Sequence, residues 1–180
     1  MIAWVTTYLI WIMVAGFVAV WLFAEDRRGK LYLGCSAVAG LVIVLILVKV
    51  AGSLYYDPRP FTVAPYPQPL IPHAPDNGFP SDHSSAAGLI AVVIALRHRW
   101  YGALLGIAAI VLAWSRVAAH VHHVTDVIAG LAFGAIAAVL GTLLVRAIFD
   151  RTKLLTWSPL ARLVGAPPPA EPGQAGAHRR

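Results

Sequence analysis

The chain has 180 residues, of which 59% are hydrophobic and 12% are charged, and its formal net charge at pH 7 is +6. A mean hydropathy of +0.73 is too high for a soluble globular domain, so the composition excludes an ordinary soluble enzyme and predicts an integral membrane protein. The one cysteine, Cys35, excludes an intramolecular disulfide and a cysteine-based metal site.

Five apolar runs follow one another along the chain, approximately at residues 2–24, 31–55, 84–96, 101–119 and 124–149. The first lacks a basic leading segment and is too long for a signal peptide, so we expect it to be a retained span. The third is short for a hydrocarbon core of about 30 Å and needs its flanking residues, or a tilt, to cross it. The pattern predicts an all-α, polytopic transmembrane bundle of about five to six spans, forming one membrane domain over residues 1–166.

The distribution of positive charge predicts the orientation in the membrane. Eleven of the fourteen lysines and arginines lie in the 25–30 loop, in the 97–99 turn and after residue 145. The positive-inside rule places these segments in the cytoplasm, and the 56–82 loop and the 120–123 turn on the outer face. The proline-rich stretch 167–180 predicts a disordered, basic cytoplasmic tail. We therefore expect membrane lipids as partners and no nucleic acid, and the sequence leaves protein partners unknown.

Three cations, Lys49, Arg59 and Arg116, remain on the predicted outer side. A cation near the hydrocarbon boundary is costly enough to need a partner or a role. Guanidinium groups match the oxygens of a phosphoryl group and stabilise the charge that spreads over them during transfer. The alternative for each arginine alone is interfacial snorkelling or pairing with Asp57 or Asp76.

The fifth run begins with His122 and Asp126. If residues 122–126 are helical, the two side chains share one face, and the carboxylate accepts a hydrogen bond from one imidazole nitrogen. The other nitrogen is then left basic, as in a nucleophile that a third group orients. The alternative is that both residues only cap the start of a helix.

A second polar segment, residues 81–83, comes directly before the third run. The hydroxyl of Ser81 and the free N–H groups at this helix start, including that of Asp82, can bind phosphate oxygens. His83 can protonate a leaving oxygen and later activate water. The alternative is a loop histidine beside an N-cap serine.

A metal site is the competing interpretation of the histidines at positions 120, 122 and 123 beside Asp126. We expect no metal and no cofactor, because the three cations on the outer side would repel a divalent ion. The remaining histidines, His73, His120 and His123, are assigned to loop packing or to the edge of the substrate.

These patches resemble the signature of the type 2 phosphatidic acid phosphatase superfamily of membrane phosphatases, which is shared with vanadium haloperoxidases. The family pattern is Lys, six residues, Arg-Pro; then Pro-Ser-Gly-His; then Ser-Arg, five residues, His, three residues, Asp. The third element is complete in Ser115, Arg116, His122 and Asp126. The second reads Pro80-Ser81-Asp82-His83, with Asp in place of Gly, and the first keeps Arg59-Pro60 with Lys49 nine residues ahead.

The resemblance implies a metal-independent mechanism through a phosphohistidine. His122 is the implied nucleophile, Asp126 orients it, and His83 acts as acid and base. The implied phosphate ligands are Arg59, Arg116 and Ser81, and the altered spacing leaves the role of Lys49 open.

Residues 73–83 look particularly like the bacterial branch that dephosphorylates undecaprenyl diphosphate, the carrier lipid of cell-wall synthesis. This implies a site on the outer face of a bacterial inner membrane, with protection against bacitracin on overproduction. Phosphatases for phosphatidylglycerol phosphate, phosphatidate or diacylglycerol diphosphate need the same phosphate pocket and remain alternatives. A small anion channel or transporter is an alternative from another class; it predicts charges deep in several spans, where Lys49 is the only candidate.

Overall fold

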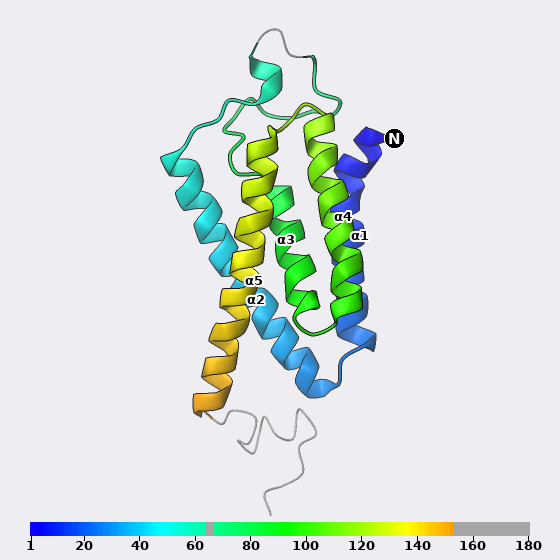
Figure 1. The fold of residues 1–180 in the computed structure, drawn as a ribbon, viewed down its shortest axis with the longest axis vertical. Helices are drawn as coiled ribbons and strands as arrows, with labels where there is room; N and C mark the ends of the chain where they lie inside the picture. The colour runs from blue at the N-terminus through cyan, green and yellow to red at the C-terminus, as the bar shows by residue number, and fades with distance from the viewer. Residues whose placement is uncertain (64–66, 153–180) are drawn as a thin grey trace, which may run out of the picture.

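The computed structural model describes residues 1–63 and 67–152, so the predicted tail 167–180 and the predicted domain boundary at residue 166 lie outside the described residues. The elements are α1 (Ile2–Phe23), α2 (Arg27–Leu54), the short 3-10 helix η1 (Pro60–Thr62), α3 (Asp82–Ala95), α4 (Arg99–Ala118) and α5 (Val124–Thr152) (Figure 1). The described part contains one isolated bridge, between Pro58 and Asn77, and no strand. The five apolar runs thus correspond to the five α-helices, and the predicted all-α membrane bundle is confirmed.

Four of these helices, α1, α2, α4 and α5, are long and apolar enough to cross a membrane. The fifth, α3, has 14 residues and is therefore about 21 Å long, shorter than a hydrocarbon core of about 30 Å. Its end at Asp82 stops below the neighbouring ends of α4 and α5 (Figure 1). The short third run of the sequence thus corresponds to a helix whose start is recessed in the bundle.

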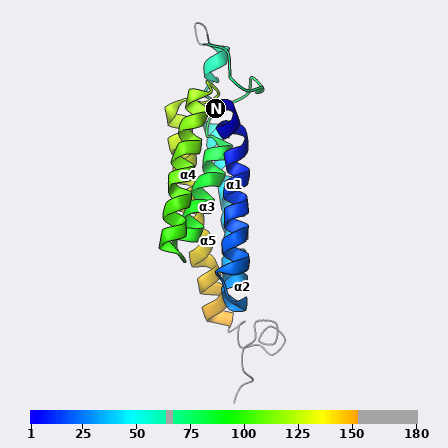
Figure 2. The ribbon, with the colours of Figure 1, turned by 90° about the vertical axis from the view of Figure 1, so that its right-hand side faces the viewer.

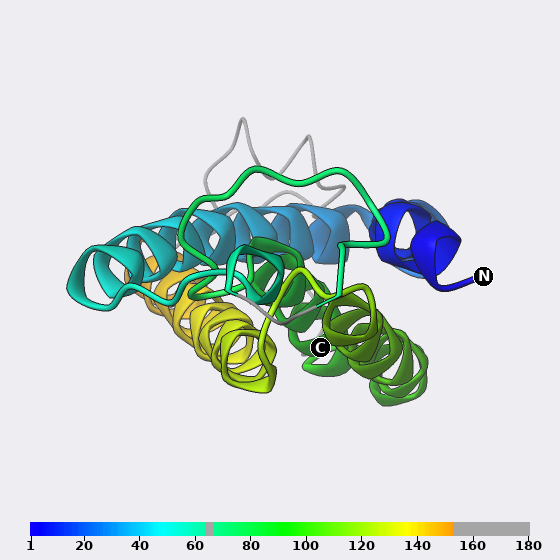
Figure 3. The same cartoon turned by 90° about the horizontal axis from the view of Figure 1, so that it is seen from above.

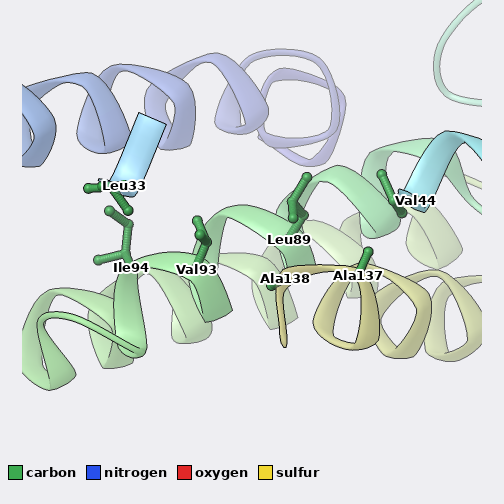
Figure 4. Close-up of a cluster of buried hydrophobic side chains, with 7 residues drawn as sticks. All are labelled: Leu33, Val44, Leu89, Val93, Ile94, Ala137 and Ala138. Atoms are coloured by element: carbon green, nitrogen blue, oxygen red, sulfur yellow. The ribbon is translucent and has the colours of Figure 1, made fainter. Parts of the chain in front are cut away.

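The bundle has α3 at its centre, with α1 and α2 on one side and α4 and α5 on the other (Figures 2 and 3). Close packing of apolar side chains fills the space between α2, α3 and α5. Figure 4 shows this core, which consists of Leu33, Val44, Leu89, Val93, Ile94, Ala137 and Ala138.

Small residues allow the helices around α5 to approach closely. A Cβ atom at Gly88 would lie 2.5 Å from the carbonyl oxygen of Leu131, and one at Gly141 would lie 2.5 Å from the backbone nitrogen of Gly40. Such contacts between small residues are typical of helices that pack in membranes. The Gly40–Gly141 contact fixes the crossing of α2 and α5, and beyond it the end of α2 at Leu54 diverges from the bundle (Figure 1).

Residues 55–63 and 67–81, the described parts of the segment between α2 and α3, lie over one end of the bundle, which we call the loop end (Figure 3). At the opposite end, the α1–α2 and α3–α4 turns meet through Glu25, whose side chain is 3% exposed. Arg97 donates to both carboxylate oxygens of Glu25, at 3.0 and 2.8 Å, and Nε2 of His98 lies 3.0 Å from Oε1. Two positively charged segments, the 25–30 loop and the 97–99 turn, therefore share the end of the bundle opposite the loop end.

Candidate active site

The turn between α4 and α5 sets the position of His122. His120 has a φ angle of 61°, a left-handed conformation that is uncommon for a residue other than glycine. The chain reverses here, and α5 begins only at Val124. His122 therefore lies before the helix, and the assumption that residues 122–126 are all helical is wrong. The reversal nevertheless brings Nδ1 of His122 to 3.4 Å from Oδ2 of Asp126.

The partners of His122 determine its tautomer. Its Nδ1 lies 3.0 Å from the carbonyl oxygen of Gly78, and its Nε2 lies 3.2 Å from Nη1 of Arg59. A carbonyl oxygen only accepts a hydrogen bond and a guanidinium only donates one, so the proton is on Nδ1 and the lone pair on Nε2. Burial lowers the pKa of His122 below its ordinary value, and the hydrogen bond to Asp126 opposes this shift. The ring is thus neutral, with its basic nitrogen facing a cation.

Asp126 lies in the first turn of α5 and is fully buried. It accepts a hydrogen bond from the backbone N–H of His123 at 2.8 Å, while its own carbonyl accepts one from the N–H of Ser81 at 3.1 Å. This residue therefore joins the start of α5 to the start of α3. An orienting carboxylate held by backbone contacts has little freedom to follow the ring that it supports.

Arg59 is buried after the end of α2 and is held by several acceptors. Its Nε donates to Oδ1 of Asp76 at 2.7 Å, and its Nη1 donates to the carbonyl of Val121 at 2.8 Å. The Arg59 guanidinium lowers the pKa of Asp76. Pairing with Asp76, expected as an alternative, is thus present, whereas Asp57 instead contacts Nδ1 of His123 at 3.1 Å.

Arg116 lies in the last turn of α4 and is 2% exposed. Its Nε has no hydrogen-bond partner within residues 1–63 and 67–152. A buried guanidinium with an unsatisfied donor is costly unless a ligand supplies the acceptor. The site therefore fits an anion at this position.

A cavity of about 490 Å³ joins these groups. Its walls carry six of the sequence-predicted site residues, namely Lys49, Arg59, Asp82, His83, Arg116 and His122. A neighbouring cavity of about 510 Å³ shares His73, His83 and Arg116 with it and extends toward Trp11 on α1. Asp126 is behind His122. The structure thus brings cations and two histidine side chains together in one cavity, an arrangement that can serve phosphoryl transfer.

Ser81 is placed differently from the other predicted residues. It is the N-cap of α3, is fully buried, and accepts hydrogen bonds from the N–H and the hydroxyl of Ser84 at 3.4 and 3.2 Å. It is not among the residues that line either of these two cavities. The capping alternative is therefore observed, and direct contact between Ser81 and a phosphate stays a prediction.

Two further residues of the site, Asn77 and Gly78, were not predicted from the sequence. The Gly78 carbonyl orients His122, but a backbone acceptor has no side-chain signature. Asn77 holds this loop, because its Nδ2 donates to the carbonyl of Gly52 at 2.9 Å and its Oδ1 accepts from the N–H of Asp57 at 2.9 Å. The adjacent Asn-Gly pair, which is typical of tight turns, was the available signal.

His73, His120 and His123, which the sequence assigned to loop packing or the substrate edge, all lie at the loop end. His73 lines both cavities, and its ring stands edge-on to that of His122 with 6.1 Å between centroids. His120 points elsewhere, with Nδ1 3.3 Å from the carbonyl oxygen of Gln68. The potential metal ligands that do converge are Asp57, His123 and Asp126, whose ligand atoms lie within 4.8 Å of one another. This differs from the predicted alternative set, which included His120 and His122.

Desolvation, and then the neighbouring Asp126, raise the pKa of Asp57. A raised pKa favours a protonated Asp57, which can donate a hydrogen bond to its neighbour. Asp57, Asp126 and His123 can thus form hydrogen bonds with one another.

Comparison with known proteins assigns the chain to a family. The model of the PAP2 superfamily matches residues 31–150. Undecaprenyl-diphosphatase BcrC of Bacillus subtilis (strain 168) is 36% identical over 144 residues, which are 79% of this chain and 70% of that protein. Bacitracin transport permease protein BcrC of Bacillus licheniformis is 34% identical over 73% of this chain and 64% of that protein. The crystal structure of Aquifex aeolicus LpxE has a TM-score of 0.61 at 21% identity, covering 76% of this chain and 82% of that one, and shows a shared fold.

Proposed function

The chain belongs to the PAP2 superfamily, and from this premise we propose that it hydrolyses undecaprenyl diphosphate to undecaprenyl phosphate and inorganic phosphate. The observation that carries the proposal is the contact between Nε2 of His122 and Nη1 of Arg59, at 3.2 Å, beside the unsatisfied Arg116. A neutral imidazole whose basic nitrogen faces Arg59, in a cavity that Arg116 also lines, is poised to attack a phosphorus atom that the two cations hold.

In the first step, Nε2 of His122 attacks the terminal phosphorus and forms an N–P bond, while the bond to the bridging oxygen breaks. The bridging oxygen keeps the electron pair and departs on the lipid phosphate. Arg59 and Arg116 stabilise the charge on the transferring group. The Nδ1–H bonds to Gly78 and Asp126 stabilise the positive charge that develops on the ring.

In the second step, His83 removes a proton from water, and the oxygen attacks the phosphohistidine. The N–P bond breaks, inorganic phosphate leaves, and the electron pair returns to Nε2 of His122. His83 lines the same cavity as His122, as this role requires. Asp126 remains ionised behind the ring throughout.

The charge distribution supports an orientation with the loop end on the outer face of a bacterial inner membrane and the C-terminus in the cytoplasm. Arg27, Arg28, Lys30, Arg97 and Arg99 all lie at the opposite end of the bundle, which suits a cytoplasmic surface. The carrier lipid would then be recycled where cell-wall synthesis releases it. Overproduction would protect against bacitracin, which sequesters the diphosphate form.

Transport remains a weaker interpretation, although one relative is named a transport permease. The charged residues of the site gather at the loop end, while the centre of the bundle is an apolar core of leucine, isoleucine, valine and alanine. An anion path needs polar groups along the whole depth of the membrane. Other lipid phosphates use the same phosphate chemistry and are separated from the proposed substrate by competition assays.

The test is phosphate release from undecaprenyl diphosphate by the purified full chain in detergent with EDTA, for the wild type and for His122→Ala. We expect EDTA to leave the wild type active and the substitution to abolish release. His120→Gly is the matched control, because it lies in the same turn, faces Gln68, and has a φ angle that glycine adopts freely. Loss of wild-type activity in EDTA would contradict the metal-free mechanism, and release by His122→Ala would contradict the nucleophile.

A further inference from the structure

The family pattern has six residues between its lysine and the Arg-Pro pair, so the lysine position corresponds to Gly52 in this chain. A side chain has little space here: a Cβ atom at Gly52 would lie 3.1 Å from the carbonyl oxygen of Phe79. The carbonyl of Gly52 also accepts a hydrogen bond from Asn77 at 2.9 Å. The loop that orients His122 is thus packed directly onto α2, and no cation is present at this point.

Lys49 lies one turn earlier on α2 and is exposed. It lines the same cavity as Gly52, Arg59 and His122, so residues three apart on one helix face share this wall. The offset of three residues moves the cation about 4.5 Å along the helix axis, away from the loop end. Lys49 is therefore about one turn farther from the loop end than the position that the family pattern uses.

The position of Lys49 matches the place that the second phosphate of a lipid diphosphate would occupy. The lipid chain is held in the membrane, so the phosphate attached to it lies deeper than the terminal phosphate. Arg59 and Arg116 gather around His122, where the terminal phosphorus must be for attack. A second phosphate, on the lipid side of the first, then comes within the part of the cavity that Lys49 lines.

We propose that Lys49 binds the departing, lipid-linked phosphate rather than the phosphate that His122 attacks, and so makes the site selective for diphosphates. This inference rests on the proposed function. When the bond to the bridging oxygen breaks, the electron pair stays on that oxygen and the departing phosphate gains one negative charge. An ammonium group placed there stabilises the charge as it forms, without a proton transfer. For a diphosphate, Lys49 thus does what proton donation by His83 would do for an alkoxide.

The test compares Lys49→Met and Lys49→Arg with the wild type in two measurements on the purified full chain. One is kcat/KM for undecaprenyl diphosphate, and the other is the inhibition constant of inorganic phosphate, which probes the attacked phosphate alone. We expect Lys49→Met to lower kcat/KM about tenfold or more, because a charge-assisted contact to the departing group is lost. The inhibition constant should stay within about twofold, and Lys49→Arg should recover most of the activity.

Arg116→Lys is the control for the other subsite and should raise the inhibition constant of inorganic phosphate. A Lys49→Met variant that weakens phosphate inhibition as much as it lowers kcat/KM would overturn the proposal, since Lys49 would then hold the attacked phosphate. Unchanged kinetics would overturn it as well. A wild type that releases no phosphate from the diphosphate would instead refute the proposed function itself, and the inference with it.

Discussion

Arg59 places Nη1 3.2 Å from Nε2 of His122, so the cation that would bind the phosphate rests on the nucleophilic nitrogen itself. The same guanidinium is anchored through Nε by Oδ1 of Asp76, at 2.7 Å, and through Nη1 itself by the Val121 carbonyl, at 2.8 Å. Arg59 can therefore exchange its contact with the imidazole for a contact with a phosphoryl oxygen while its other bonds hold it in place.

Arg59→Lys should lower kcat/KM about 100-fold, because an ammonium group cannot reproduce the planar fork that meets these partners at once. Steady-state phosphate release is the measurement. Asp76→Asn serves as the control and should cost less than tenfold, since the Asp76 side chain is 62% exposed and the carbonyl of Val121 remains as an anchor. An Arg59→Lys variant with wild-type kinetics would show that the guanidinium geometry is not used.

Asp126→Asn should reduce kcat about 100-fold without changing the fold of the turn. The carbonyl of Gly78, 3.0 Å from Nδ1 of His122, still fixes the tautomer, so the loss is confined to the electrostatic stabilisation of the imidazolium. Single-turnover kinetics isolate this step, because phosphoryl transfer to His122 precedes water attack. A loss as complete as that of His122→Ala would instead show that the carboxylate alone orients the ring.

The pH dependence of kcat/KM should show its acidic limb below pH 6.5. Burial lowers the pKa of His122 from the ordinary value of 6.5, so the neutral, nucleophilic form persists in more acidic solution. Asp126 opposes this shift, and Asp126→Asn should therefore move the limb further toward acid. A limb at or above pH 6.5 in the wild type would contradict this electrostatic description.

Glu25→Ala should destabilise the protein by about 1–2 kcal/mol and leave kcat/KM within twofold, because the buried carboxylate joins two turns far from the site. The partial exposure of Arg97 and His98, 38% and 26%, lets water replace part of the lost contact. Thermal unfolding in detergent measures the loss. Arg146→Ala is the control: its pair with Asp150 is 3.8 Å long and more than 70% exposed on both sides, so the change should be at most about 0.5 kcal/mol.

The Glu25 contribution also has a definite pH dependence. Hydrogen bonding from Arg97 is the main cause that lowers the pKa of Glu25 below 4.5. The stabilisation is therefore present at neutral pH and is lost as the pH falls below 4.5 toward the folded-state value. An acid transition that is unchanged in Glu25→Ala would argue against a role for this carboxylate.

The helices could be predicted from the sequence because a helix is one of the few structures that an apolar run of this length can form in a membrane. The short third apolar run likewise predicted that α3, with 14 residues, is shorter than the other helices. The site residues Arg59, Arg116 and His122 were predicted by charge and spacing, and the structure brings them to one cavity. Gly78 could not be predicted, because its role depends on a backbone carbonyl. The helical geometry expected at His122 was wrong because the left-handed turn at His120 delays the start of α5.

The recessed start of α3 has a consequence for which molecules reach His83. This histidine is in the first turn of a helix only 14 residues long, so it lies below the ends of α4 and α5, while His122 lies in the turn that joins those two helices (Figure 1). A phosphate on a membrane lipid can reach this depth by lateral diffusion in the bilayer. A water-soluble phosphate ester would have to give up its hydration and descend past the loop. The depth of His83 therefore favours lipid-linked phosphates over water-soluble phosphate esters, independently of any contact with the lipid chain.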